Sequence, residues 1–479
     1  ANSFGRQVEF ARITFPTPMA PYYTGGMTVP HPPEGEESGE GEPEGFIQQR
    51  WHPATGEPLG DRGGGLVEWL LDFHRDLMWP QGLGGRTAGR TLVGIVGIIL
   101  MLSILSGVIA HTKIFQELFT LRYFRSVRLK WQDTHKVIGL WGLPFYTMIA
   151  FTGAVLGVVA ILAPLVALLT FKGDQEALIA AVLGAPIEPA GIEAPMLSVD
   201  DLSKLREPES GKPVEFIVMN QLGDQNARFD IYFPTDKELE RYEGYQINGV
   251  TGERIADSQF ENITAANKSV NIVSPLHYGN YGGGGAGTVA LKGLYFLLGL
   301  SLAVITALGL MMWVERRLHG NIGNRSEWVY RELGHLITGF CLGLPLATAS
   351  IFYLDKLFVG AEAMRLYWTG ITYFAAWAIG IVYAFLRRND YAVVRELLVL
   401  TGALFVGLPI INVLTTNEQF LSALGSGHKA TGFVDLAFLL SGILTILVAI
   451  SLPKNRSEKA EGRIVTVSDS GALSTTPAE

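Results

Sequence analysis

The stretch Thr91–Ala110 reads TLVGIVGIILMLSILSGVIA and contains neither a charged residue nor a proline. A helix that crosses the hydrocarbon core of a bilayer needs about 20 mainly apolar residues. The stretch has that length, and it lacks the polar face of a helix at the surface of a soluble domain. The sequence therefore predicts a membrane-spanning helix here.

Six further stretches have the same character. Only 17% of the 479 residues are charged, against about a quarter in soluble domains. The second stretch is overlong and contains Pro164, which lacks an amide hydrogen, so we expect it to tilt or break there. The predicted fold is mainly α, a polytopic membrane helical bundle. Its seven spans are Thr91–Ala110, Val137–Leu169, Val289–Val314, His335–Leu354, Leu366–Leu386, Val393–Leu414 and Ala430–Leu452.

Lysine and arginine alternate between the connections that join these spans. The first connection and the tail are rich in both residues and the third and fifth in arginine, whereas the fourth and sixth are poor in both. Basic connections concentrate on the cytoplasmic side of a membrane. The chain then divides into an outer N-terminal segment (1–90), transmembrane helices 1–2 (91–169), an outer domain (170–288), transmembrane helices 3–7 (289–452) and a cytoplasmic tail (453–479).

The two outer segments differ in composition. Residues 31–45 are rich in proline, glycine and glutamate and predict a linker without a core. Residues 174–260 instead have the pattern of a small α+β domain. We expect helices at Asp174–Leu183 and Asp200–Leu205 (behind a Ser198 cap), strands at Val214–Met219 and Arg228–Phe233, and a hairpin over Tyr242–Ile255 that turns at Asn248-Gly249.

An internal repeat links the two outer segments. One unit runs WHPATGEPLG, then FHRDL around His74, then a glycine-rich link and the first span. The other runs YQINGVTGERI, then SPLHYG around His277, then a glycine-rich link and the third span. Repeated units tend to occupy equivalent positions. We therefore expect His74 and His277 at similar depth, just outside the outer membrane face, where glycine lets backbone approach a flat ligand.

A second pair of histidines lies at the predicted inner face. His111 ends the first span and His135 opens the second, so a short connection brings them to the same depth. Two neutral imidazoles facing each other across helices can hold a low-spin haem iron, and the core of a helix bundle is a recurrent cofactor site. The pattern indicates haem iron held at both faces.

Each of these histidines also has a structural interpretation, which stays open. A histidine at a membrane interface commonly contacts lipid headgroups or bonds to a backbone carbonyl. His335, which opens the fourth span at the inner face, is a further candidate ligand. The remaining histidines lie in loops or turns, where we expect solvent contact: His31, His52, His319 and His428.

The sequence resembles the PepSY-associated transmembrane proteins, a family that includes bacterial periplasmic ferric-siderophore reductases. The order of the histidines is the specific part of the resemblance. The matching stretches are FHRDL (Phe73–Leu77), SGVIAHTKIFQELFTLR (Ser106–Arg122), WQDTHKVIGLWGLPFYTMIAFTGAV (Trp131–Val155), SPLHYGNYGG (Ser274–Gly283), LKGLYFLLGL (Leu291–Leu300) and GLPIINVLTT (Gly407–Thr416).

The resemblance implies a helical bundle in the bacterial inner membrane with a small periplasmic PepSY-like domain, formed by residues 174–260 with a related half-unit near 46–60. It implies two b-type haems. By matching position, His111 and His135 would serve the inner haem, and His74 and His277 the outer one. Electrons would pass outward from the cytoplasmic side and reduce a ferric siderophore, because hard oxygen ligands hold iron(III) better than iron(II).

One departure from the family concerns the start of the chain. Family members usually begin with another span that carries an early histidine followed by tryptophan, and this sequence starts after such a span. We expect that helix to have carried the outer N-terminal segment across the membrane. A histidine supplied by it would change the partner of His111 or His135.

Other functions fit the sequence less well. The net charge of −8 argues against nucleic acid, and there is no Rossmann or Walker motif, so flavin or nicotinamide would belong to a partner. A transporter would need ionisable residues at mid-depth of the spans, which carry almost none. The alternative that stays open is a non-catalytic accessory subunit of a larger respiratory or transport complex, which predicts co-purifying membrane subunits and little activity alone.

Overall fold

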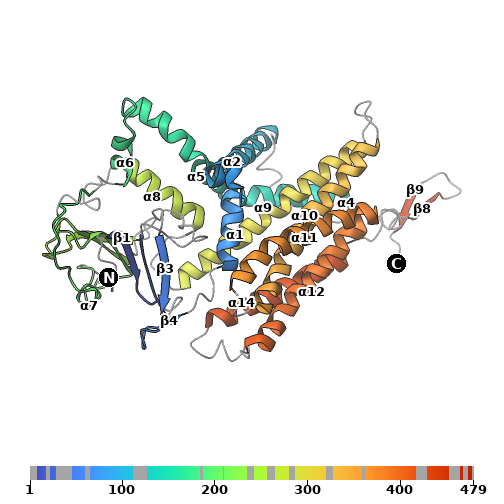
Figure 1. Ribbon diagram of the computed structural model, residues 1–479. Coiled ribbons are helices and arrows are strands. Elements are labelled where there is room, and N and C mark those ends of the chain that lie inside the picture. Colours follow the sequence, from blue (N-terminus) through green and yellow to red (C-terminus); the bar gives the residue numbers. More distant parts are fainter. Residues whose placement is uncertain are drawn as a thin grey trace. The chain divides into compact units, whose positions relative to one another are not determined.

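The chain divides into two compact units, and Figure 1 shows its elements in the computed structural model. The first unit comprises residues 1–61, 71–111 and 143–299, and the second comprises 62–70, 112–142 and 300–479. The structure describes residues 8–17, 22–28, 46–59, 65–111, 127–183, 187–208, 210–234, 242–255, 265–279, 286–319, 327–358, 362–416, 429–452, 464–467 and 473–476. The expected linker at 31–45 lies outside these ranges.

Among the described residues, seven helices are long and apolar enough to cross a membrane, which confirms the predicted spans. Large apolar side chains on them face outward, such as Ile109 (79% exposed) and Leu386 (78%). Such surface is stable only against lipid, so the protein is a membrane protein. The seven are α2 (Gly85–Ala110), α5 (Leu143–Thr170), α9 (Ala286–His319), α10 (Glu327–Leu357), α11 (Glu362–Arg387), α12 (Asp390–Thr416) and α14 (Lys429–Ser451).

The overlong second stretch breaks at a different place from the one predicted. Helix α5 runs through Pro164 without interruption, and a separate helix α4 (Val127–Trp141) precedes it. The interruption lies at Gly142, just before Pro144. Proline is favoured in the first turn of a helix, where its missing amide hydrogen costs nothing, but it cannot continue the helix before it. His135 therefore lies on α4 and not at the start of a spanning helix.

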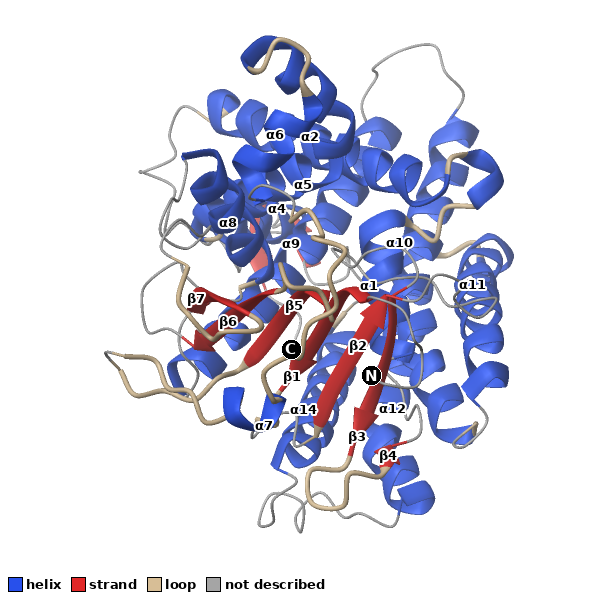
Figure 2. Cartoon of the chain, turned by 60° about the vertical axis from the view of Figure 1, so that its left-hand side comes forward, coloured by secondary structure: helices blue, strands red, loops and turns tan. Residues whose placement is uncertain are grey.

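The first unit contains a seven-stranded antiparallel sheet in the order β4-β3-β2-β1-β5-β6-β7 (Figure 2). Its two halves are meanders that meet at a central pair, in which Ile13 of β1 lies opposite Ile217 of β5. The strands are β1 (Val8–Thr14), β2 (Tyr23–Thr28), β3 (Phe46–Trp51), β4 (Pro58–Leu59), β5 (Phe216–Leu222), β6 (Arg228–Pro234) and β7 (Tyr242–Asn248).

The predicted α+β elements of the second outer segment are present. Strands β5 and β6 and the turn after Asn248 match the pattern. The two short helices are α6 (Gln175–Leu183) and α7 (Val199–Leu202), and the Ser198 hydroxyl caps α7 by accepting the Asp200 amide. One face of β6 is the core of the sheet, because Phe229, Ile231 and Phe233 are fully buried. Period-two alternation in the sequence predicted that face.

The sheet also fixes a topological relation. Strand β1 precedes α2 and its partner β5 follows α5, so both segments lie on the same side of any membrane that α2 and α5 cross. A β-sheet edge exposed to lipid would leave its backbone groups unpaired, so the sheet itself stays outside the bilayer.

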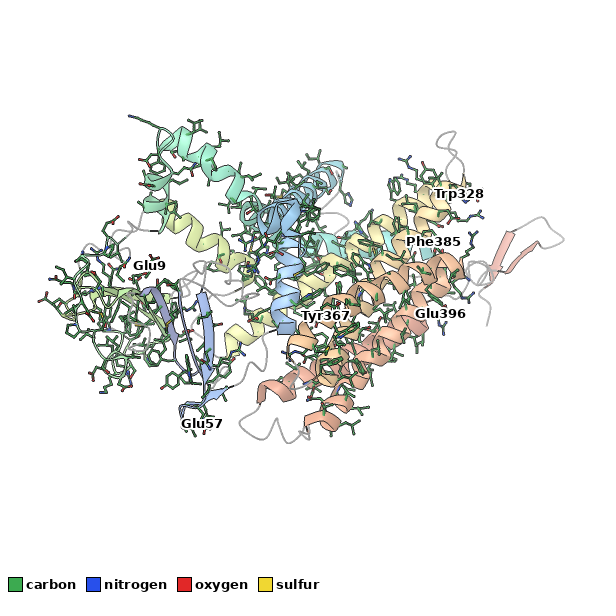
Figure 3. The ribbon with its side chains drawn as sticks, viewed as in Figure 1. Glu9, Glu57, Trp328, Tyr367, Phe385 and Glu396 are labelled. Carbon is green, nitrogen blue, oxygen red and sulfur yellow. The ribbon has the colours of Figure 1, made fainter. Side chains whose placement is uncertain are left out.

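The second unit packs α10, α11, α12 and α14 around small and branched side chains. Ala384 and Val393 are fully buried between α11 and α12. At one end of these helices the Glu396 carboxylate, labelled in Figure 3, accepts hydrogen bonds from Tyr383 and Arg387. Exposed Trp328 and Tyr367 lie near helix starts, as aromatic residues do at membrane interfaces.

The remaining elements are short. Helix α1 (Gly65–Asp76) begins in the second unit and ends in the first. The others are the 3-10 helix η1 (Gln81–Leu83), helix α8 (Ala265–Tyr278) and a ribbon in the tail made of β8 (Ile464–Val467) and β9 (Leu473–Thr476).

Candidate functional site

The internal repeat seen in the sequence forms two turns with the same hydrogen bonds. After β3 the His52 amide donates to the Glu57 carbonyl, and the Gly56 amide donates to the His52 carbonyl, each at 2.9 Å. After β7 the Asn248 amide donates to Glu253 at 2.9 Å and the Gly252 amide to Asn248 at 3.0 Å. Both glycines have positive φ, 68° and 78°. The Thr-Gly-Glu match is therefore a real structural repeat.

The side chains of the two turns correspond as well. His52 Nδ1 accepts the amides of residues 54 and 55, and Asn248 Oδ1 accepts those of 250 and 251. In each turn the threonine hydroxyl accepts the glutamate amide at 3.3 Å. His52 thus has a capping role in its turn, which the sequence did not reveal.

The histidines that follow these turns come together. His74 lies in the last turn of α1 and His277 in the last turn of α8, and both belong to the first unit. Their ring centroids are 6.3 Å apart and their planes differ by 27°. The two rings therefore lie close together with nearly parallel planes, and their depth relative to a membrane stays a prediction.

A hydroxyl of α5 sets the protonation of His277. Thr152 Oγ1 lies 3.0 Å from His277 Nδ1 and 2.8 Å from the Met148 carbonyl oxygen. A hydroxyl has one hydrogen, and the carbonyl can only accept, so Thr152 donates to Met148 and accepts from Nδ1–H of His277. The lone pair of the neutral imidazole is then on Nε2. Metal-bound histidines are oriented in the same way by a partner on the second nitrogen.

The position of His277 is fixed by close packing. A Cβ at Gly153 would lie 3.0 Å from His277 Cε1, so only glycine leaves the ring its place. The end of α8 is held by α9, because the Tyr295 hydroxyl donates to the Leu276 carbonyl (2.8 Å) and Lys292 Nζ donates to the Tyr278 carbonyl (3.1 Å). These bonds satisfy carbonyls that a helix end leaves unpaired.

The position of His74 depends instead on the contact of α1 with α2. A Cβ at Gly89 would lie 1.9 Å from the Asp76 carbonyl oxygen, so the two helices touch backbone to backbone. Arg86 of α2 reaches Asp72 (3.2 Å) and the buried Asp76 (3.6 Å). Burial lowers the pKa of His74, which favours the neutral imidazole that metals bind.

The separation of the two rings fits one metal held between them. A metal–nitrogen bond is about 2 Å long and the ring centre lies roughly 1 Å behind the nitrogen, so opposed imidazoles on one iron have centroids about 6 Å apart. Packed aromatic rings also occur at such separations. The contact of His277 Nδ1 with Thr152 and the lowered pKa of His74 are both compatible with metal ligation. Thr152 and Gly153 were not singled out in the sequence, although a polar residue beside a glycine inside a span was a usable signal.

The two expected inner ligands lie in different units. His111 ends α2, where its amide donates to the Val108 carbonyl. His135, in the second unit, packs on α9: a Cβ at Gly309 would lie 3.3 Å from His135 Cε1. His135 Nδ1 is buried and has no hydrogen-bond partner among the described residues. The pairing of His111 with His135 stays a prediction.

His335 differs from the position expected for it. Helix α10 begins at Glu327, so His335 lies two turns inside the helix and is only 3% exposed. Its Nδ1 lies 2.6 Å from Asp390 Oδ1 at the start of α12. The residue therefore belongs to the packed interior of the second unit, where it forms a histidine–carboxylate pair.

The chain is similar to known proteins over most of its length. The model of the PepSY-associated TM region matches residues 7–316, which contain both repeats. The chain belongs to this family. An uncharacterized protein of Pseudomonas aeruginosa is 28% identical over 394 residues, 79% of this chain and 93% of the relative. The PepSY-associated match includes all four histidines proposed as ligands and ends within α9.

Proposed function

We propose that this PepSY-associated protein is a haem-b electron carrier of the bacterial inner membrane, which passes electrons from the cytoplasmic side to a periplasmic acceptor. The observation that carries the proposal is the opposed pair His74 and His277, 6.3 Å apart between their ring centroids. A haem brings four nitrogen ligands of its own and needs two more from the protein. His74 and His277 would supply these two.

The residues around the pair have defined tasks. His74 and His277 would hold the iron, and Thr152 keeps the lone pair of His277 on Nε2. The glycine at 153 leaves room for the ring. When bound, the haem supplies the one-electron chemistry, and the protein supplies orientation and electrostatics.

A ferric siderophore is the acceptor that we propose. The support is the resemblance to siderophore reductases, together with the alternation of basic connections, which favours a periplasmic sheet and a cytoplasmic C-terminus. Reduction to iron(II) weakens its bonds to hard oxygen ligands and releases the metal. A haem at the face nearer the sheet would be the last carrier before that acceptor.

The proposal is tested by a reduced-minus-oxidised absorption spectrum of the purified full chain, with haem quantified per chain. His277→Ala and His74→Ala should each remove the outer haem. The matched control is His52→Asn, because His52 is exposed, lies outside the pair and has an asparagine as its counterpart in the other repeat. Unchanged haem content in both alanine variants would overturn the assignment of the pair.

The same preparation tests the inner site. His111→Ala and His135→Ala should remove a second haem and leave the outer one, and two haems per chain are expected in the unsubstituted protein. Reduction of a ferric siderophore by the loaded protein is then measured directly. A protein that carries no haem and co-purifies with other membrane subunits would instead support an accessory role.

A further inference from the structure

The second unit contains a cavity that the proposed function does not yet use. Four helices form it: α9, α10, α12 and the end of α14. Its volume is about 80 Å³, measured as the space open to the centres of water molecules. One water needs about 10–15 Å³ on this measure, so the cavity has room for about six waters.

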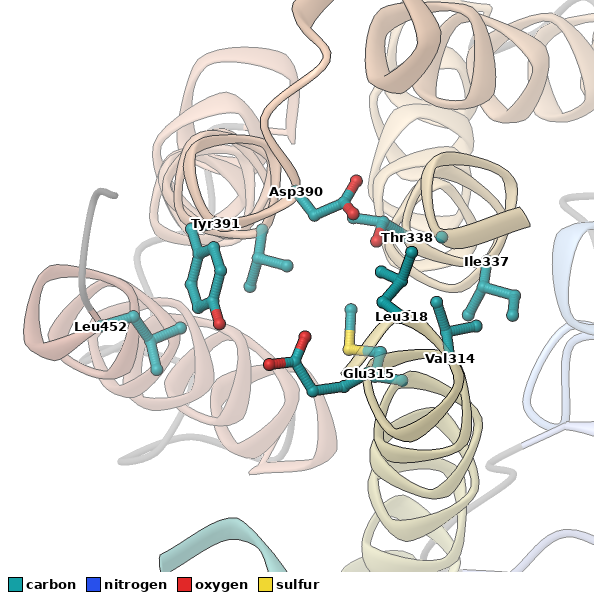
Figure 4. A pocket seen from close by; sticks show the side chains of 11 residues that line it. Val314, Glu315, Leu318, Ile337, Thr338, Asp390, Tyr391 and Leu452 are labelled. Atoms are coloured by element: carbon teal, nitrogen blue, oxygen red, sulfur yellow. The ribbon is translucent and has the colours of Figure 1, made fainter. Parts of the chain in front are cut away.

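The walls combine apolar surface with a few polar groups. Val314, Ile337 and Val394 are among the apolar lining residues. Figure 4 shows the Glu315 carboxylate and the Tyr391 hydroxyl turned toward the middle of the cavity, with Asp390 beside it. Apolar walls with a small number of convergent polar groups are typical of sites for small organic molecules.

The polar groups suit a ligand that donates hydrogen bonds and gives up protons. Glu315 and Asp390 are acceptors on two different helices, α9 and α12. Asp390 Oδ1 also lies 2.6 Å from His335 Nδ1, so His335 holds this carboxylate in place. A hydroquinone has two O–H groups on opposite sides of one flat ring, which matches two carboxylates across an apolar cavity.

The cavity also lies near the ends of the spans, a depth that the ring of a membrane hydroquinone can reach. It is formed by the last turns of the α9 span and the first turns of α10 and α12, at the ends that the basic connections assign to the cytoplasmic side. Membrane hydroquinones dissolve in the bilayer, and their ring reaches the boundary between hydrocarbon and water.

Helix α9 connects the cavity to an expected haem ligand. His135 packs at Gly309, whereas Met311, Glu315 and Leu318 line the cavity. At 3.6 residues per turn these three lie on the face of α9 opposite to Gly309. One helix, about 10 Å in diameter, therefore separates His135 from the cavity.

We propose that this cavity binds the ring of a membrane hydroquinone as the electron donor. The inference rests on the proposed electron-transfer function, whose donor the sequence left open. Oxidation of one hydroquinone breaks two O–H bonds and releases two electrons and two protons. His135 would hold the haem that accepts these electrons one at a time, and the outward electron transfer of the proposed function would reoxidise that haem between the two transfers. The protons go to the carboxylates of Glu315 and Asp390 and then to water.

Binding is tested with a short-chain benzoquinone that carries a photoreactive azide, added to the full-length protein in lipid nanodiscs. Labelled peptides should contain residues 311–318, 334–338 or 390–394, and excess unlabelled benzoquinone should abolish the labelling. Val394→Phe fills the cavity and should lower the competed labelling at least tenfold. The control Leu400→Phe, on the outward face of the same helix (47% exposed), should change it less than twofold.

Electron transfer gives a second measurement. The reduced benzohydroquinone, mixed anaerobically, should reduce the haem of the unsubstituted protein, and Glu315→Gln should slow this at least tenfold while dithionite still reduces all of it. Competed labelling without haem would overturn the proposed function alone. Haem without competed labelling, or labelling unaffected by Val394→Phe, would overturn the hydroquinone site alone.

Discussion

The two repeats have the same turn but hold their histidines by different means. In the first repeat, His74 depends on the backbone contact of α1 with α2 at Gly89 and on ion pairs around Asp76. In the second, His277 depends on a glycine and a hydroxyl of the neighbouring span. Equivalent residues of a duplicated unit can thus differ in their surroundings: the His277 ring contacts a hydroxyl, whereas the helix that carries His74 is positioned by a backbone contact and ion pairs.

The contact of α1 with α2 that holds His74 should be most strongly disrupted by a substitution at Gly89. Gly89→Val places a side chain where the Asp76 carbonyl oxygen lies, so α1 must move and carry His74 away from His277. We expect the outer haem content to fall at least tenfold. The measurement is the haem spectrum of the purified variant, and Gly107→Val on the same helix, with nothing within 4 Å of its Cβ, is the control. Equal haem in both variants would contradict the role of the α1–α2 contact.

The packing of the His277 ring against α5 should be disrupted by Gly153→Leu. The new side chain competes for the space of the His277 ring, which can yield partly because α8 is a short helix. We expect a loss of outer haem of several-fold, smaller than that of Gly89→Val, again by haem per chain. Gly299→Leu, whose Cβ would meet nothing within 4 Å, should retain full haem.

The variant Thr152→Val tests the hydrogen bond that His277 makes with Thr152. Valine keeps the shape of threonine and removes the acceptor for His277 Nδ1–H. Loss of that bond makes the imidazole a weaker donor and favours ferrous iron. A hydrogen bond worth about 1 kcal/mol corresponds to roughly 40 mV for one electron, so the midpoint potential of the outer haem should rise by at most that. Thr152→Ser should restore the original value. A potential unchanged in Thr152→Val would show that Thr152 does not position the ligand.

The smallest change in stability is expected for a substitution in the two turns, where the repeats are most alike. His52→Asn gives the first turn the capping residue of the second, so its amide hydrogen bonds can be made again. Stability should change by less than about 0.5 kcal/mol, and hydrogen exchange at Thr55 and Glu57 should stay protected. Rapid exchange at these amides would show that the turns are not interchangeable.

Much of this fold could be predicted because its signals are local. Apolar length identified the seven spans, alternation identified β5 and β6, and the Ser198 cap identified the start of α7. The position of the break near His135 was missed because two prolines, Pro144 and Pro164, compete to end a helix. Proline favours the start of a helix only when it lies in the first turn, as Pro144 does and Pro164 does not.

The site could be predicted only in part. The repeat order predicted that His74 and His277 lie at similar depth, but it did not give the 6.3 Å separation of their ring centroids. The groups that orient them, Thr152 and Gly89, lie on helices distant in sequence. Their roles depend on which helix faces which, and that information is tertiary. The N-terminal strands were missed for the same reason, because β1 is defined by its partner β5.

The central pairing of the sheet has a consequence for how the protein is made. Strand β1 ends at Thr14, but its partner β5 is complete only at Leu222, after α2, α4 and α5 have been synthesised. At about 5–20 residues per second the wait is roughly ten to forty seconds. During that time β1 is a strand edge without its neighbour, which invites pairing with other chains. Assembly in the cell should therefore depend on protecting this edge until the second meander arrives.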